Sequence, residues 1–240
     1  MISRSFLRPA VVVVVAALVF QACSEDLLAP AQDAQEEMVE LQITLPRPMF
    51  AGQPHPVMSD NLGPDSGKPR PPFMVPSGTR LLSLGADVSA SDEPLIGKLT
   101  MVTDGNKEAT CEDGFVEFTP GLQWVQVDLG RTYEIQAIVV WLSHRHRVRA
   151  YRDVIVRVSD DPDFVEYVEL FNNDHDNTSG LGAGSDYEYV ETNEGRLIDA
   201  KATRARYVRV YSNGNTSNDM NHMIEVEVYG RLMHRKIGYT

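Results

Sequence analysis

The sequence predicts an all-β protein folded as an antiparallel sandwich, because short strands recur from about residue 79 and no segment keeps a helical apolar period. Within residues 123–129, 154–158 and 224–228, three aliphatic side chains recur at every second position. Turn-forming residues separate such runs, as at 159–162. About 150 residues suffice for one well-buried core, so we expect a single sandwich domain.

The first element is a secretion signal, predicted over residues 1–22. Two arginines precede an apolar run at 10–20, and a small residue follows it. Residues 18–23 resemble a bacterial lipobox, which implies that Cys23 is diacylated and becomes the mature N-terminus. By the same resemblance, Ser24 implies anchoring in the outer membrane, at the cell surface of a Gram-negative bacterium. The alternative is an ordinary cleaved signal with Cys23 incidental.

A Pro-rich segment follows, predicted as a linker over residues 23–78. Ten of the 14 prolines lie between positions 30 and 76. Proline fixes φ and removes a donor, so we expect an extended, semi-rigid stalk with one short strand at 40–45. The alternative is a strap packed on the domain, because four side chains of this segment are large and apolar: Met49, Phe50, Phe73 and Met74.

The domain itself is predicted over residues 79–231, followed by a C-terminal tail at 232–240. The run at 135–142 is continuously apolar and includes Trp141, which favours a strand covered on both faces. Residues 207–211 alternate aromatic or charged side chains with valines.

Composition excludes several classes of protein. The chain carries 22 Lys+Arg against 34 Asp+Glu, a formal charge of −12, which disfavours nucleic-acid binding. Two cysteines cannot build the framework of a disulfide-stapled miniprotein. No apolar run reaches the roughly 20 residues of a transmembrane helix.

Six segments carry a resemblance to a known family: Leu82–Ser91, Thr103–Asn106, Gln123–Gly130, Val156–Asp161, Arg206–Val210 and Ile224–Gly230. In this order they resemble the discoidin domain, also called the coagulation factor V/VIII C-type domain, a galactose-binding-like relative of family 32 carbohydrate-binding modules. The resemblance implies a jelly-roll sandwich of about eight strands. It also implies a binding function, because family members dock glycans, lipid headgroups or proteins through loops at one end.

A structural calcium ion is the cofactor that this resemblance implies. The turn at 104–106 contains a glycine and could aim carboxylate and carbonyl oxygens at one point, and calcium takes six to eight such ligands. The implied ligands are the Met101 carbonyl, Asp104, the Asn106 carbonyl, Thr110, the Ile224 carbonyl and Glu225. The alternative is a plain turn with Glu225 solvated. Cys111 lies close to where relatives often carry a Trp.

The candidate ligand site lies in a basic island at 144–152. In sugar-binding relatives a His, an Arg and an Asn from neighbouring loops bond a galactose-like ring. The corresponding residues here are His144, Arg147 or Arg149, and Asn213 or Asn215; Tyr151 and Tyr211 are candidates for an aromatic platform. The alternative is that these arginines pair with carboxylates across the sandwich. The Asx-rich run at 172–177 favours a turn over a second metal site.

No catalytic motif is present: we find no Gly-x-Ser-x-Gly elbow, no His-Glu-x-x-His and no His partner for Cys111. We therefore predict a non-catalytic, surface-displayed lipoprotein that binds glycans and is held at the membrane by its lipid. The alternative is a protein-interaction or structural lipoprotein of the cell envelope without a sugar site. A concave pocket with an exposed aromatic side chain would favour the first hypothesis.

Overall fold

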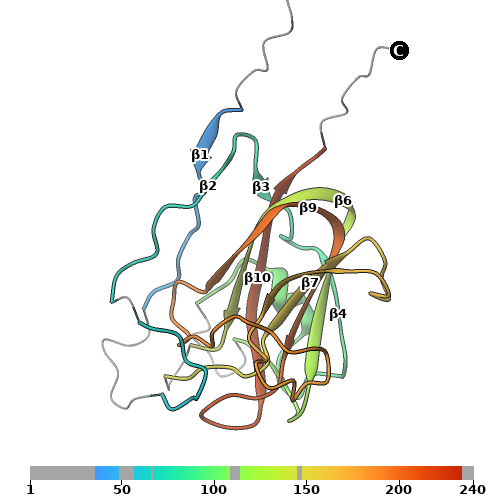
Figure 1. The fold of residues 1–240 in the computed structure, drawn as a ribbon. Helices are drawn as coiled ribbons and strands as arrows, with labels where there is room; N and C mark the ends of the chain where they lie inside the picture. The colour runs from blue at the N-terminus through green and yellow to red at the C-terminus, as the bar shows by residue number, and fades with distance from the viewer. Residues whose placement is uncertain (1–35, 49–56, 66, 109–113, 145–147, 234–240) are drawn as a thin grey trace, which may run out of the picture. The chain divides into compact units, whose positions relative to one another are not determined.

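The computed structural model describes residues 36–48, 57–65, 67–108, 114–144 and 148–233 (Figure 1). The predicted signal peptide, Cys23, and most of the C-terminal tail lie outside the described residues. Within the described residues, no helix is long and apolar enough to cross a bilayer. A single 3-10 turn, η1 (Leu99–Thr103), is the helical element of this part of the chain.

Eight strands form one antiparallel, hydrogen-bonded network, which confirms the predicted all-β sandwich. They are β3 (Arg80–Leu81), β4 (Asp87–Ala90), β5 (Val116–Phe118), β6 (Gln123–Leu142), β7 (Ile155–Ser159), β8 (Val168–Asn172), β9 (Arg196–Ser212) and β10 (Asn221–Arg231). The main order is β3-β10-β6-β9-β7-β8, with β4 also pairing β6 and β5 also pairing β10.

The two layers share the long strands β6 and β9. The first part of β6 pairs β4, and after a register shift between Asp128 and Tyr133 its second part pairs β10. Such an irregularity bends a strand, and Gly130 supplies the positive φ of 78° there. Ser212, paired with Gln123, also donates to Asn221 at the start of β10 at 2.8 Å. Both ends of β6 therefore lie at one end of the sandwich.

The second half of β6 is buried on both faces, as its continuous apolar sequence predicts. Ile138, Val140 and Leu142 belong to the main core between the layers. Val139 and Trp141 belong to a second cluster with Ala137 and two residues of β10. A second covering layer must therefore lie over this strand.

The Pro-rich segment supplies that layer. In its described parts it packs on the domain as a strap, instead of the expected extended stalk. We call the described parts of residues 36–76 the strap. Leu41, Ile43 and Phe73 pack on the second cluster, and the Leu41 amide donates to the Phe73 carbonyl at 2.8 Å. Packing on the domain thereby half-buries three apolar side chains that a stalk would leave in water.

The strap also carries a small sheet of its own. Strand β1 (Met38–Glu40) pairs antiparallel with β2 (Met74–Pro76). The strand expected at 40–45 thus forms slightly earlier in the chain.

Candidate functional site

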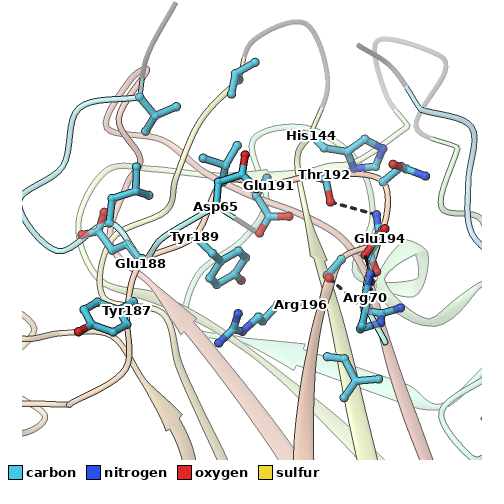
Figure 2. Close-up of a pocket in the computed structure, with 18 of the residues that line it drawn as sticks. Asp65, Arg70, His144, Tyr187, Glu188, Tyr189, Glu191, Thr192, Glu194 and Arg196 are labelled. Atoms are coloured by element: carbon cyan, nitrogen blue, oxygen red, sulfur yellow. Dashed lines mark hydrogen bonds between the residues drawn. The ribbon is translucent and has the colours of Figure 1, made fainter. Parts of the chain in front are cut away.

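A cavity of about 950 Å³ lies between the strap and the segment that leads into β9. Strap residues between 57 and 70 line one side, and residues 187–197 line the other. His144 and Val148, which follow β6, and Pro48 of the strap complete the described lining. The cavity therefore borders the connections that follow β6 and precede β9 (Figure 2).

Five residues of this lining carry buried polar atoms that make no hydrogen bond of ordinary geometry. They are both ring nitrogens of His144, Oε2 of Glu188, Oη of Tyr189, both carboxyl oxygens of Glu191 and Nε of Arg196. Across the part of the chain that the structure describes, every such buried side-chain atom belongs to this one cavity. Each unpaired buried group costs about 1–3 kcal/mol, so their concentration here indicates a ligand-binding function.

Burial favours the uncharged form of three of these groups. It raises the pKa of Glu191 to about 8, although the positive charges of Arg196 and Arg149 oppose the shift. Burial likewise raises the pKa of Tyr189 well above its usual value and lowers the pKa of His144. A protonated carboxyl, a phenol and a neutral imidazole each offer a donor and an acceptor.

Arg196 is held in place by aromatic rings. Its guanidinium lies 5.0 Å from the ring centroids of both Phe171 and Tyr189, and these two rings meet edge-on at 6.0 Å. Figure 2 shows Arg196 and Tyr189 beside each other, with Glu191 above them. Stacking thus fixes the guanidinium, and its buried Nε has no hydrogen-bond partner.

An exposed tyrosine lies at the rim. Tyr187 lines the cavity and leaves 59% of its surface exposed. Burial also raises the pKa of Glu188, the next residue along the chain.

The turn that precedes β9 is packed on Trp141. The indole Nε1 donates to the Asn193 carbonyl at 3.0 Å. Gly195 has a φ of 65°, and a Cβ there would lie 2.7 Å from the Trp141 ring. This close approach requires glycine and positions Arg196 at the start of the strand.

Of the predicted sugar ligands that are described, only His144 lines the cavity; Arg147 lies outside the described residues. Arg149 is buried in the interior, where its charge acts on Glu117, Tyr151 and Glu191. The predicted platforms Tyr151 and Tyr211 are also buried.

The side-chain amides of the two predicted asparagines are already hydrogen-bonded within the protein. Asn213 donates to Asp153 at 2.8 Å, and Asn215 donates to Asn218 and to the Met220 carbonyl. The loops do meet, because Tyr151 and Asn215 form a β-bridge. The Asn215 amide is thus used within its own turn and the Asn213 amide in a contact with the Asp153 loop, and neither residue lines the cavity with His144.

The residues of the predicted calcium loop do come together. Both carboxylate oxygens of Glu225 lie 3.2 Å from the Gly105 amide, which donates to them across 120 residues of sequence. Glu225 is fully buried, so it is not the solvated residue of the alternative hypothesis. A register shift beside Ile224 interrupts its pairing with β6. Asp104 is exposed next to this turn, and Thr110 lies outside the described residues.

The charge around Glu225 fits a cation. Burial and the neighbouring carboxylates of Glu227 and Asp104 together raise its pKa to about 8, although the Gly105 amide and the Lys107 ammonium oppose the shift. Buried carboxylate oxygen with a second carboxyl nearby is the ligand type that calcium prefers.

The Asx-rich run at 172–177 forms a turn, as predicted. Oxygens of Asp153, Asp174 and Asp176 lie within 4.8 Å of one another. The Asp174 carboxylate accepts from the amides of Thr178 and Ser179, and Asp153 accepts from Thr178 and Asn213. These oxygens are therefore already used within the turn.

Sequence reasoning missed Tyr187, Glu188, Glu191 and Arg196. They lie in an irregular connection that matches no motif, and acidic loop residues are usually solvated. The one available signal was the aromatic and acidic alternation at 187–189.

The fold and the cavity define a β-sandwich domain with a polar pocket. Residues 88–226 match the model of the F5/8 type C domain, and the chain belongs to this family, which confirms the family predicted from the six segments. The match begins after the strap. No curated protein matches the chain.

Several solved structures are similar in fold. A family 89 glycoside hydrolase from Clostridium perfringens is 18% identical over 67% of this chain and 16% of that chain, with a TM-score of 0.48. The family 32 module of AlyQ, in complex with 4,5-unsaturated mannuronic acid, is 20% identical over 62% and 97%, with a TM-score of 0.40. A fucose-binding module from Streptococcus pneumoniae is 17% identical over 62% and 97%, with a TM-score of 0.44. The chain thus spans about a sixth of the hydrolase.

Proposed function

We propose that this protein is a non-catalytic glycan-binding protein and that a neutral sugar occupies the cavity between the strap and the sandwich. The observation that carries the proposal is the cluster of buried donors and acceptors on Glu191, Tyr189 and His144, whose contacts with one another and with the Leu142 backbone do not reach ordinary hydrogen-bond geometry. Each hydroxyl of a sugar both donates and accepts, so a polyhydroxylated ligand can satisfy this mixed set.

The charges of the cavity support a neutral ligand. An anion would face the Glu188 carboxylate, and a cation would face the Arg196 guanidinium, whereas sugar hydroxyls can pair with both. Family membership supports the proposal as well, because F5/8 type C relatives bind through loops at one end. The cavity lies beside such loops, those that follow β6 and precede β9.

Tyr187 supplies the exposed aromatic platform that a sugar site needs. We expect Tyr187→Ala to weaken binding about 3- to 10-fold, because an aromatic contact contributes about 0.5–1.5 kcal/mol. The wild type is first screened on a glycan array, and the affinity for its best neutral glycan is then measured by calorimetry. Tyr167→Ala is the control, since Tyr167 is 45% exposed but lies over Arg157, outside the cavity.

The same array decides between the two hypotheses about function. Binding of no glycan by the wild type would reject the sugar site and favour the protein-interaction or structural lipoprotein. An equal loss of glycan affinity in the Tyr187→Ala and Tyr167→Ala variants would reject this cavity as the place where sugar binds. Release of a shorter or hydrolysed sugar during incubation would contradict the non-catalytic part of the proposal.

We also propose a structural calcium ion, held by Asp104, Glu225 and the carbonyls of Met101, Asn106 and Ile224. When bound, the ion would offset the negative charge around Glu225 and pin the 101–108 loop to β10. Because calcium needs the ionised carboxylate, its affinity should rise up to about tenfold per pH unit below pH 8 and then level off. Without calcium, the free energy of unfolding should fall as pH rises from about 4.5 to about 8, since the folded state holds this proton.

Thermal melts with calcium or with a chelator, at pH 6 and pH 8, test this proposal. The wild type should gain thermal stability from calcium, more at pH 8 than at pH 6, and Glu225→Gln should gain none. Glu93→Gln, on the exposed surface, serves as the control. A melting temperature that calcium leaves unchanged at both pH values would reject the site.

Display at the outer membrane through a lipid on Cys23 rests on the sequence alone, since residues 1–35 lie outside the described part of the chain. The mass of the mature N-terminus tests it, and an unmodified terminus would reject it.

A further inference from the structure

We infer that the strap is part of the binding site and that the protein takes a neutral oligosaccharide, held between the strap and the sandwich. This inference rests on the proposed function and deepens it. Val57, Leu62, Pro64, Lys68 and Arg70 of the strap line the cavity opposite residues 187–197. All of these strap residues precede the family match, which begins at residue 88. One wall of the site is therefore specific to this chain's N-terminal segment.

A first tether fixes the strap at one side of the cavity. The Gly63 amide donates to the Glu188 carbonyl at 2.8 Å, and the Glu188 amide donates to the Asn61 carbonyl at 3.0 Å. The Asn61 side chain donates to the carbonyls of Asn173 and Asp186, at 3.2 and 3.0 Å. Asn61 itself does not line the cavity. It therefore holds the wall without being available to a ligand.

A second tether lies seven residues after Gly63 along the strap. The Arg70 amide donates to the Glu194 carboxylate at 3.1 Å, and its guanidinium donates to the carbonyls of Glu194 and Gly195. The sandwich wall between the two tethers, residues 189–193, contains Tyr189 and Glu191 with their unpaired polar atoms. The two tethers thus flank the part of the cavity wall that carries Tyr189 and Glu191.

The close approach at the first tether depends on Gly63. A Cβ at this position would lie 2.9 Å from Cβ of Tyr187 and 3.3 Å from the Glu188 carbonyl oxygen. A larger residue must push the strap away from the platform tyrosine. The contact at Gly63 therefore fixes the strap wall of the cavity relative to Tyr187.

The volume of the cavity points to more than one sugar residue. At ~30 Å³ of liquid volume per water, about 950 Å³ equals roughly 30 waters. That is more than twice the roughly 12 non-hydrogen atoms of one hexose, and it lies at the upper end of the usual range for small-molecule sites. A single sugar on the sandwich wall would leave the strap wall uncontacted.

Two full-length variants test the inference, Asn61→Ala and Gly63→Val. Neither change removes a polar side chain that lines the cavity. Binding is measured on an array of neutral monosaccharides and oligosaccharides, then by calorimetry with the oligosaccharide that the wild type binds most tightly. We expect each variant to bind it at least about tenfold more weakly, with faster amide exchange at residues 57–65. Gly67→Asn is the control, because Gly67 has open space around it and Asn tolerates its φ of 61°.

The outcomes separate the two proposals. If the wild type binds an oligosaccharide and both variants bind it equally well despite faster exchange in the strap, the strap is not part of the site. If a monosaccharide binds as tightly as its oligosaccharides, the ligand class is wrong. If the wild type binds no glycan at all, the proposed function fails and this inference with it. Should Gly63→Val not fold, Asn61→Ala alone carries the test.

Discussion

Arg196→Ala is expected to weaken binding of the preferred glycan about 10- to 100-fold. A hydrogen bond to a charged group contributes about 1.5–3 kcal/mol, and about 1.4 kcal/mol corresponds to a factor of ten in affinity. Nε of Arg196 has no partner in the free protein, so a ligand can take this donor without breaking an existing bond. Phe171 and Tyr189 already hold the guanidinium, so little further ordering is needed on binding.

Arg209 provides a matched control for this experiment. Its guanidinium is also stacked between two rings, 4.4 Å from Trp124 and 4.1 Å from Phe164, but it does not line the cavity. Arg209→Ala should therefore lose a similar amount of packing and keep its affinity for the glycan. Calorimetry on both variants measures the difference. A loss of affinity that is the same in the two variants would show that packing, and not the Arg196 donor, is responsible.

Lys107→Ala is expected to lower the free energy of unfolding by about 3–5 kcal/mol, the largest effect on stability that we predict. Nζ of Lys107 pairs with Oε1 of Glu227, and the side chains are only 7% and 3% exposed. The second oxygen of Glu227 accepts from the Tyr229 hydroxyl at 2.6 Å. Removing the ammonium leaves a buried carboxylate without its counter-charge. The lysine also lies 4.9 Å from the Trp141 ring centroid, a contact that would be lost too.

The exposed pair between Arg47 and Glu108 is the matched control for Lys107. Those side chains are 78% and 38% exposed, so Arg47→Ala should cost no more than about 1 kcal/mol. Urea unfolding of both variants gives the two free energies. If Lys107→Ala unfolds at the same urea concentration as Arg47→Ala, the buried pair does not stabilise the fold. Such a result would also weaken the electrostatic argument for calcium, because Glu227 raises the pKa of Glu225.

The strands were predictable because their alternation is local. The sequence predicts two strands, at 123–129 and 135–142. The structure joins them in β6, since Gly130 allows the chain to bend without ending the strand. The strap was harder to predict. Its prolines exclude long strands and helices, but whether Leu41 and Phe73 meet water or protein depends on a cluster formed by β6 and β10.

The candidate site was likewise only partly predictable from the sequence. The family resemblance, which rests on short local motifs, predicted that the 104–106 turn lies next to Glu225. The family resemblance did not predict the cavity, because the two walls of the cavity lie more than 100 residues apart in the chain. Glu188 and Glu191 look like ordinary loop acids, and only the strap and the neighbouring strands remove them from water.

The sequence by itself determined the all-β sandwich and its family, because apolar alternation and turn residues act over a few positions. The tertiary structure alone decided which polar groups are buried and unpaired. Burial, and the pKa of about 8 that it imposes on Glu191, arises from segments distant in the chain that close over the same space. The asparagines predicted from the resemblance instead bond other protein groups, Asn213 to Asp153 and Asn215 within its own turn, and the polar cavity forms where the strap meets the connection into β9.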